Sequence, residues 1–222
     1  MESCCIEQFL EGKTIFITGA TGYLAKILTE KILRVQPNVK KIYLLIRAPD
    51  SNSAKQRFNN EVIKTNLFGV LREKLGANLH GFIEDNKVFP VAGDIGCDSL
   101  GINSELKDEM CREIDIIVNS AATTRFDERY DTAIRTNVLG AMHILNFSKQ
   151  CSKLMMLLHV STAYVCGEKE GLILEKLLNY GETPNGSSHL DIDVEQNLVE
   201  EALKELQDRN ATEKEVRLAR EF

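Results

Sequence analysis

The residues with the clearest chemical meaning form a glycine-rich turn near the start of the chain, with Gly19 and Gly22 as its two glycines. A β-rich run, residues 14–18, precedes this turn, and apolar residues at helical spacing follow it. In such a context the first glycine permits a tight turn, the second lets a backbone approach a pyrophosphate, and the helix N-terminus attracts the phosphates. Ala25 stands where a third glycine is commoner. The turn therefore predicts a dinucleotide-binding site, with a plain strand–helix connection as the alternative.

Arg47 follows the second β-rich run, residues 42–46, at the point where a dinucleotide site holds the ribose of the adenosine. Proteins that bind NAD(H) usually carry Asp or Glu here, because a carboxylate accepts a hydrogen bond from the 2′-hydroxyl. An arginine suits a 2′-phosphate instead, through charge-assisted hydrogen bonds. The sequence therefore favours NADPH over NADH, and the alternative is a solvated arginine at a strand end.

Two further strand ends supply residues for the same ligand. Asp94 and Ile95 follow the third β-rich run, residues 88–92, and are predicted to lie beside the adenine. Small residues, Ala121 among them, follow the fourth run, residues 114–119, where a backbone has to pass close to a cofactor. Ligands of open α/β sheets bind at the carboxyl ends of the strands, so these positions agree with the glycine-rich turn.

Thr162 lies just beyond the fifth β-rich run, residues 154–160. A hydroxyl at this strand end would face the nicotinamide and donate a hydrogen bond to a carbonyl oxygen that becomes anionic. The alternative is a strand-end hydroxyl with its own local partner. The neighbouring His159 is predicted to be a buried, hydrogen-bonded histidine rather than a base, because nothing nearby supplies a nucleophile.

The five β-rich runs alternate with segments of helical spacing, and this order predicts an α/β fold with a Rossmann-like, doubly wound parallel sheet. Pro90 in the third run predicts an edge strand, because proline cannot donate a hydrogen bond to a neighbouring strand. Residues 52–86 form a long insertion between the second and third strands, also with helical spacing. The apolar stripes expected to cover the sheet comprise Tyr23, Leu24, Ile27, Leu28, Ile32 and Leu33 in one helix, and Ile134, Val138, Met142, Leu145 and Cys151 in another.

Charge divides the chain into two parts. Residues 182–222 hold 11 acidic and 5 basic side chains, whereas residues 1–181 are balanced. We therefore predict an NADP-binding domain over residues 1–181, with its insertion at 52–86, followed by an acidic loop and helical segment over residues 182–222. In the second part Asp193 with Gln196 is typical of a helix capping box. Because the chain has no basic stripe, nucleic acid is not an expected partner.

Cysteine spacing and hydropathy narrow the remaining possibilities. The six cysteines include no C-x-x-C pair and no Cys/His cluster, which indicates reduced thiols and no metal site. The longest charge-free runs have about 13–14 residues, fewer than a transmembrane helix needs. The N-terminus is acidic, unlike a signal or transit peptide. We therefore expect an intracellular protein, in the cytoplasm or at the endoplasmic reticulum, with peripheral membrane association and oligomeric state left open.

Longer motifs carry a resemblance to a known family. They are TGATGYLA at residues 18–25, NSAATTRFDERYD at 119–131, TNVLGA at 136–141 and HVSTAYVCGE at 159–168. Together they resemble the extended short-chain dehydrogenase/reductase superfamily. Within it, KILRVQPNVKKIYLLIRAPD at residues 31–50 and FDERYD are similar to the plant alcohol-forming fatty acyl-CoA reductases, and the resemblance extends over about residues 8–207.

This resemblance implies an activity, a substrate and a cofactor. The activity is the NADPH-dependent reduction of a long-chain fatty acyl-CoA to a primary fatty alcohol. Thr162 would match the catalytic Ser or Thr of the family. The NADPH-binding residues expected from the strand ends and from the resemblance together are Thr18, Gly19, Thr21, Gly22, Tyr23, Leu24, Arg47, Asp94, Ile95, Ala121 and Asn137.

The sequence departs from the family at the proton donor, which is a Tyr followed four residues later by a Lys whose cation lowers the tyrosine pKa. Here the residues at that distance from the five tyrosines are Ile27, Arg47, Ile134, Glu168 and Pro184. The chain therefore resembles the N-terminal half of such a reductase, and we expect a sheet that is incomplete at its C-terminal side, with a partly uncovered fifth strand. The alternatives are a catalytically inactive nucleotide-binding remnant and another thioester reductase of the same superfamily.

Overall fold

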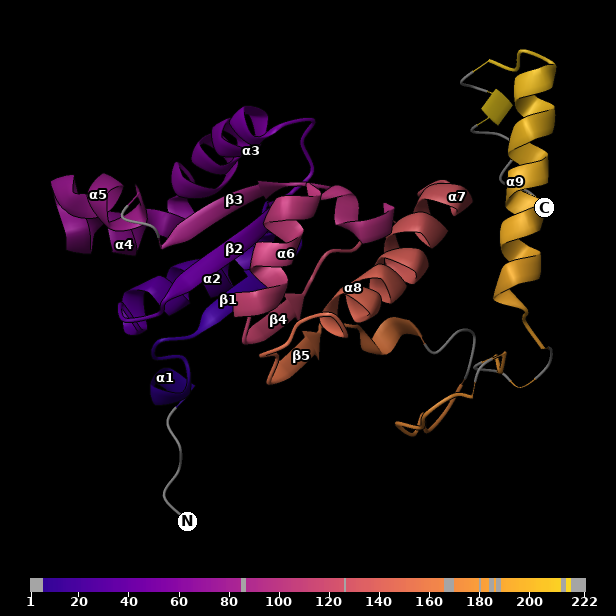
Figure 1. The fold of residues 1–222 in the computed structure, drawn as a ribbon. Coiled ribbons are helices and arrows are strands. Elements are labelled where there is room, and N and C mark those ends of the chain that lie inside the picture. The colour runs from indigo at the N-terminus through magenta and orange to yellow at the C-terminus, as the bar shows by residue number, and fades with distance from the viewer. Residues whose placement is uncertain are drawn as a thin grey trace. The chain divides into compact units, whose positions relative to one another are not determined.

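The computed structural model describes residues 6–84, 87–125, 127–165, 170–179, 181–183, 186, 189–212 and 215–216 of the chain. It contains a five-stranded parallel sheet in the order β3-β2-β1-β4-β5 (Figure 1). The strands are β1 (Thr14–Ile17), β2 (Lys41–Ile46), β3 (Val88–Ala92), β4 (Ile116–Asn119) and β5 (Met156–His159). The predicted Rossmann-like α/β fold is confirmed, and Pro90 lies in the edge strand β3, as expected.

Helices of the chain alternate with these strands (Figure 1). They are α1 (Ile6–Phe9), α2 (Tyr23–Val35), α3 (Ser51–Phe58), α4 (Gly69–Leu75), α5 (Leu79–Glu84), α6 (Ser104–Glu113), α7 (Tyr130–Ala133), α8 (Gly140–Ser148) and α9 (Ile192–Asp208).

Two apolar cores lie on opposite faces of the sheet, because alternate side chains of a strand point to opposite sides. Ile15 and Ile17 of β1 belong to one core, together with buried residues of α2, α3 and α4. Phe16, between them, belongs to the other core and packs against Phe147 of α8, with 5.4 Å between the ring centroids. All four residues of β1 are buried, so the strand that carries the glycine-rich turn is fixed from both sides.

The apolar stripe predicted for α2 is wrong in its first half. Tyr23, Leu24 and Ile27 are 72, 51 and 36% exposed, whereas Ala25 and Leu33 are buried. At 3.6 residues per turn, Ile27 and Leu33 project about 120° apart, so one narrow helix face cannot bury both. The small side chain of Ala25 marks the face that packs on the sheet.

A π-helical turn, Ile134–Leu139, precedes α8 and changes which of its faces meets the sheet. A π turn holds more residues than an α turn, so the side chains after it are rotated relative to a regular helix. Met142 and Leu145, which were predicted to cover the sheet, are 47 and 45% exposed. Ile144 and Phe147 are buried in their place, so this part of the predicted stripe is wrong.

The insertion at residues 52–86 consists of short helical pieces. A π-helical turn, Asn59–Ile63, and a 3₁₀ turn, Asn66–Phe68, separate α3 from α4. Phe58 and Val62, at helical spacing in the sequence, are both buried in the same core as α2. The insertion therefore covers one face of the sheet next to α2.

β5 is the second edge strand and the least covered one. Met156 and Leu158 are 39 and 46% exposed, and the preceding Met155 is 58% exposed. The partly uncovered fifth strand expected from the sequence is confirmed.

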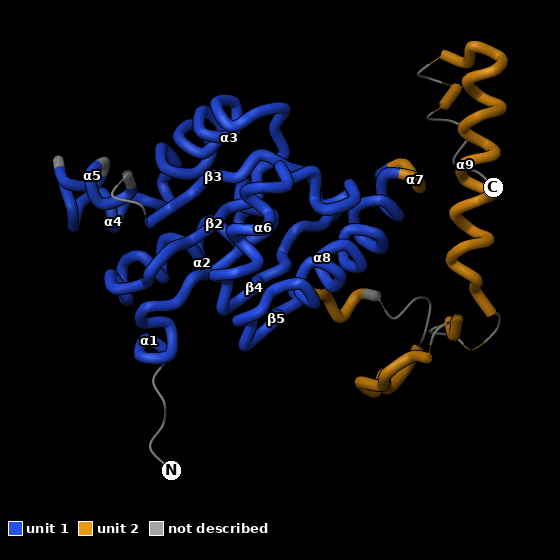
Figure 2. The backbone as a smooth tube through the Cα atoms, in the orientation of Figure 1, with its two compact units in different colours: residues 1–128, 132–160 blue, residues 129–131, 161–222 orange. Residues whose placement is uncertain are grey.

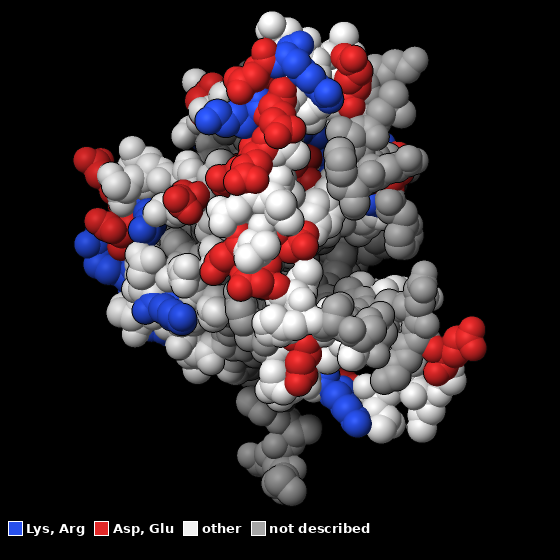
Figure 3. Space-filling model, turned by 90° about the vertical axis from the view of Figure 1, so that its right-hand side faces the viewer, with Lys and Arg blue, Asp and Glu red and all other residues white. Residues whose placement is uncertain are grey.

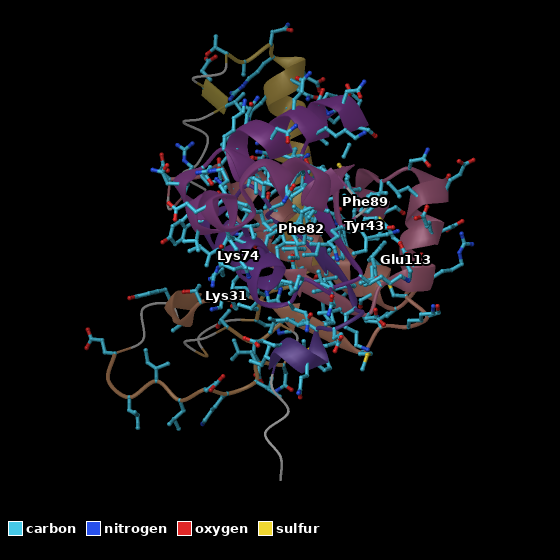
Figure 4. All side chains as sticks on the ribbon, turned by 90° about the vertical axis from the view of Figure 1, so that its left-hand side faces the viewer. Lys31, Tyr43, Lys74, Phe82, Phe89 and Glu113 are labelled. Atoms are coloured by element: carbon cyan, nitrogen blue, oxygen red, sulfur yellow. The ribbon has the colours of Figure 1, made fainter. Side chains whose placement is uncertain are left out.

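A polar cluster ties the start of β2 to α6 (Figure 4). The buried Tyr43 hydroxyl donates a hydrogen bond to Glu113, whose Oε1 lies 2.6 Å from Lys41 Nζ. The same ammonium lies 4.8 Å from the centroid of the Phe89 ring. Burial, together with the neighbouring Glu113 carboxylate, raises the pKa of Tyr43. The cluster joins β2, β3 and α6 at the amino-terminal end of β2.

The chain forms two compact units (Figure 2). Unit 1 comprises residues 1–128 and 132–160, and unit 2 comprises residues 129–131 and 161–222. The domain boundary expected after residue 181 stays a prediction. In the part of the chain that the structure describes, no helix is long and apolar enough to cross a membrane.

In unit 2, the cap of α9 is Asp191 rather than the predicted Asp193. Asp191 Oδ1 accepts hydrogen bonds from the backbone N–H groups of Asp193 and Val194, at 3.0 and 3.3 Å. The prediction is wrong because the helix begins at Ile192, and the residue before the first helical one reaches the free N–H groups. Acidic side chains gather along α9, as Figure 3 shows, in agreement with the acidic composition of this part of the sequence.

Candidate functional site

The glycine-rich turn after β1 lies against the loop after β4. Gly19 has a φ of +68°, in the left-handed region that favours glycine. A Cβ atom at this position would lie 2.8 Å from the Ser120 carbonyl oxygen and 2.9 Å from Ala121 Cα. Gly22 has an ordinary φ of −77°, and a Cβ atom there would lie 3.0 Å from the Gly19 carbonyl oxygen. Gly19 is therefore required by conformation and by space, whereas a side chain at Gly22 would make one tight contact, with a single backbone atom of the turn.

α2 begins with an open N-terminus. Its N-cap is Gly22, no side chain of the described residues caps it, and its first turn holds no acidic residue. The first backbone N–H groups are thus available to an anion at the positive end of the helix dipole. Tyr23 and Leu24 are the first two residues of α2 and their side chains are exposed, so their predicted role in cofactor binding would rest on their backbone N–H groups. The turn and the start of α2 form a cradle that fits a pyrophosphate.

A cavity of about 520 Å³ lies at the carboxyl ends of β1, β2, β3 and β4, within unit 1. This is the edge of an open α/β sheet where ligands bind, and the volume is in the range of cofactor sites. The predicted residues that line it are Gly19, Thr21, Gly22, Arg47, Asp94, Ile95 and Ala121. The fold thus brings together residues from four strand ends that are far apart in the sequence.

Arg47 is exposed and lines this cavity at the end of β2. Among the residues that the structure describes, nothing forms a hydrogen bond or ion pair with its guanidinium. All five of its N–H donors are therefore free for a ligand. An unpaired arginine in place of a carboxylate at this strand end fits a 2′-phosphate better than a 2′-hydroxyl.

A chain of hydrogen bonds fixes the loop after β4. The buried Thr18 hydroxyl donates to Asn119 Oδ1 at 2.6 Å and accepts from the backbone N–H groups of Ser120 and Ala121, at 3.2 and 3.1 Å. Asn119 Nδ2 lies 3.0 Å from His159 Nδ1. Because an amide nitrogen only donates, the His159 nitrogen is the acceptor. Thr18 does not line the cavity but holds the loop that does.

The predicted burial of His159 is wrong. The residue is hydrogen-bonded, as predicted, but its side chain is exposed rather than buried. The reason is that His159 ends the edge strand β5, which has a neighbouring strand on one side only.

Asp94 and Asn137 shape the loops on either side of the cavity. Asp94 Oδ1 accepts a hydrogen bond from the Gly96 N–H at 2.9 Å, and its Oδ2 lies 3.4 Å from Arg135 Nη2. Asn137 pairs twice with the Thr123 backbone: its Oδ1 accepts from the N–H at 2.9 Å and its Nδ2 donates to the carbonyl at 3.1 Å. Thr123 lines the cavity and Asn137 does not, so Asn137 acts by holding its wall.

Several polar residues of the cavity were not singled out from the sequence. Arg125 forms a fork with Asp127, at 3.1 and 3.0 Å. Glu128 Oε2 accepts a hydrogen bond from the Thr123 hydroxyl at 3.2 Å. The alternation of charge within residues 125–129 was the available signal, but it does not indicate which residues face a cavity. These residues are Arg57, Thr124, Arg125, Glu128, Thr132 and Thr136.

Thr162 belongs to unit 2 and is exposed. Its Oγ1 accepts a hydrogen bond from the Tyr164 N–H at 3.2 Å. This local bond occupies one acceptor position and leaves the hydroxyl proton free to donate. Its catalytic role stays a prediction.

Comparison with known proteins places the chain in a family. Residues 17–217 match the family model described as Male sterility protein, a family of NAD-binding domains. The chain belongs to this family. It is 56% identical to Fatty acyl-CoA reductase 1 of Arabidopsis thaliana over 209 residues, which are 94% of this chain and 42% of that protein. It is 53% identical to the Alcohol-forming fatty acyl-CoA reductase of Simmondsia chinensis over 213 residues, 96% of this chain and 43% of that protein.

The chain spans less than half the length of these curated relatives. Among solved structures, it resembles the terminal R domain from the myxalamid PKS-NRPS biosynthetic pathway, with a TM-score of 0.61, 26% identity, and coverage of 81% of this chain and 42% of that one. It also resembles a reductase domain of a nonribosomal peptide synthetase from Mycobacterium tuberculosis, with a TM-score of 0.56, 26% identity, and coverage of 71 and 35%. The family and these reductase neighbours indicate that this chain binds a nicotinamide cofactor.

Proposed function

We propose that this protein serves the NADPH-dependent reduction of a long-chain fatty acyl-CoA to a primary fatty alcohol, with unit 1 as the cofactor-binding part. The observation that carries the proposal is the cavity of unit 1, in which an open helix N-terminus and the unpaired Arg47 lie at neighbouring strand ends. The named relatives support the acyl-CoA substrate, because they are fatty acyl-CoA reductases. The proposal places the protein inside the cell, in the cytoplasm or at the endoplasmic reticulum.

The residues of this chain have separate tasks in that reaction. The backbone at Gly19 and Gly22 and the first N–H groups of α2 hold the pyrophosphate, and Arg47 binds the 2′-phosphate. When bound, NADPH supplies the hydride. Two hydrides and two protons convert the thioester into the alcohol and free CoA thiol, with an aldehyde formed after the first reduction. Thr162 donates a hydrogen bond to the carbonyl oxygen as negative charge develops on it.

A second candidate function is nucleotide binding without turnover. The sequence favours it at one point, because no Tyr is followed by a Lys at the spacing that lowers a tyrosine pKa for proton transfer. Positioned proton donors of this kind contribute about 10²–10⁴-fold to a rate, so a chain without one would bind cofactor and turn over very slowly.

An exchange of segments separates the two candidates. The matching region of the Arabidopsis thaliana Fatty acyl-CoA reductase 1 is replaced by this chain, and the product from palmitoyl-CoA and NADPH is measured by gas chromatography. The proposal expects fatty alcohol from the chimera, and a loss of product with Gly22→Val in the same chimera. The isolated chain is measured in parallel and is expected to bind NADPH without forming alcohol. A folded chimera without product would contradict the reductase proposal, and a chain that binds no NADPH would contradict both candidates.

A further inference from the structure

A fork of hydrogen bonds joins α3 to the end of β2. Arg57 Nε and Nη2 donate to Glu61 Oε1 and Oε2, at 2.6 and 2.8 Å. Arg57 Nη1 donates to the backbone carbonyl oxygen of Arg47 at 2.6 Å. The planar guanidinium of Arg57 thus donates to the Glu61 carboxylate with Nε and Nη2, and to the Arg47 backbone carbonyl with Nη1. The geometry fixes the guanidinium plane, because two parallel bonds to one carboxylate leave little freedom to rotate.

The backbone on both sides of Arg47 is also held. Ile46 is paired with β3, and its carbonyl oxygen accepts a hydrogen bond from the Gly93 N–H at 3.2 Å. Asp50 caps α3 through a bond from the Ser53 N–H to Oδ1, at 2.8 Å. Between these two anchors, Arg57 Nη1 holds the carbonyl oxygen of Arg47. The Arg57 contact therefore restrains the peptide unit from which the Arg47 side chain projects.

Arg47 and Arg57 differ in whether a carboxylate pairs with the guanidinium. Both line the cavity, but the Arg57 guanidinium is neutralised by Glu61, whereas the Arg47 guanidinium has no partner among the described residues. The bond from Arg57 lowers the pKa of the Glu61 carboxyl, so the pair stays ionised near neutral pH. An ion pair with no net charge attracts a phosphate less than a free guanidinium does. Arg47 is the better phosphate ligand of the two.

We propose that Arg57 and Glu61 are positioning residues that aim Arg47 at the 2′-phosphate and so determine the preference for NADPH. This inference rests on the proposed function, because it assumes that NADPH occupies the cavity. A positioning role of Arg57 and a direct phosphate-binding role predict opposite effects on NADPH binding when the charge of Glu61 is removed. If Arg57 bound the phosphate itself, removing the charge of Glu61 would release it and strengthen NADPH binding. If Arg57 acts through Arg47, the same change weakens NADPH binding.

The test compares the dissociation constants of NADPH and NADH for the full chain and its variants, by fluorescence titration. Glu61→Gln and Arg57→Lys are each expected to raise the Kd for NADPH about fivefold to tenfold, because one charge-assisted bond is lost or misaligned. The Kd for NADH, which has no 2′-phosphate, is expected to stay within about twofold. Arg34→Lys is the matched control, because Arg34 forms the same kind of pair with Glu30 at 2.8 Å and does not line the cavity.

A double variant distinguishes positioning from a general structural role. In an Arg47→Ala background, Glu61→Gln is expected to have no further effect on the Kd for NADPH, because the side chain that it aims is gone. Additive effects of the two changes, or tighter NADPH binding by Glu61→Gln alone, would overturn the inference. A wild-type chain that binds NADPH no more tightly than NADH would overturn the proposed cofactor preference as well. A wild-type preference that Glu61→Gln leaves unchanged would overturn the positioning role only.

Discussion

The end of β1 and the edge strand β5 belong to the same sheet but differ in how far they are buried. Every residue of β1 is buried, and the turn after it is closed by hydrogen bonds that the backbone N–H groups of Ser120 and Ala121 donate to the Thr18 hydroxyl. In β5, Met156 and Leu158 remain 39 and 46% exposed. The part of the sheet that carries the glycine-rich turn is thus buried and fixed by hydrogen bonds within unit 1, whereas β5 ends in an exposed His159.

The largest expected effect concerns the closed end of β1. Gly19→Ala is expected to lower the free energy of unfolding by about 2–4 kcal/mol, because the residue has a positive φ and the new methyl group meets the Ser120 carbonyl. Gly12→Ala is the matched control: Gly12 also has a positive φ, +65°, but no described atom within 4 Å of a Cβ. Its expected loss is about 1 kcal/mol, from backbone strain alone. Urea denaturation of both variants measures the difference, and equal losses would mean that the close contact with the β4 loop is unimportant.

Gly22 should separate binding from folding at the same turn. Its φ of −77° is allowed for any residue, so Gly22→Val is expected to leave the circular dichroism spectrum nearly unchanged. The side chain would nevertheless block the approach of the pyrophosphate to the backbone, and the Kd for NADPH should rise by about tenfold or more. A folded variant with unchanged NADPH affinity would show that the turn is only a strand–helix connection.

The opposite end of β2 offers a pH-dependent comparison. Burial beside Glu113 raises the pKa of Tyr43 above its unfolded value of about 10. The protonated hydroxyl therefore contributes stability that is fully present below about pH 10 and is lost as the pH rises further. Tyr43→Phe is expected to show a smaller loss of stability between about pH 9 and 11 than wild type. Parallel losses in the two proteins, measured by urea denaturation across this range, would contradict the role given to Tyr43.

The smallest effect on stability is expected at β5. The double change Met156→Thr and Leu158→Thr introduces β-branched side chains, which suit a strand, and removes exposed apolar surface, so the free energy of unfolding should change by less than about 1 kcal/mol. Binding of a hydrophobic dye and self-association should both decrease, because an exposed apolar edge strand favours pairing. Ile117→Ala in the neighbouring buried strand is the contrast, with an expected loss of about 2–5 kcal/mol. Unchanged dye binding by the double variant would mean that the dye binds to another surface.

The sequence predicts residues whose role is local to one strand or strand end better than contacts between separate elements. Gly19, Arg47 and Pro90 are interpretable because each has a local meaning at a strand end or within a strand. The stripe of α8 is mispredicted because a π-helical turn changes the helical phase, and no residue type announces that turn. Arg57 escapes prediction for a different reason: its contact with the Arg47 carbonyl depends on how α3 packs beside β2. The residue that could bind a phosphate is thus easier to predict than the contact that positions it.

The measurement that tests the central claim most directly is the ratio of the Kd values for NADPH and NADH, in wild type and in Arg47→Ala. A free guanidinium at the end of β2 should make wild type bind NADPH more tightly than NADH. Removing it should weaken NADPH binding by about tenfold to hundredfold and leave NADH binding nearly unchanged, because a charge-assisted phosphate contact is worth about 1.5–3 kcal/mol. Equal affinities of wild type for the two cofactors, or an Arg47→Ala variant that keeps the preference, would contradict the account.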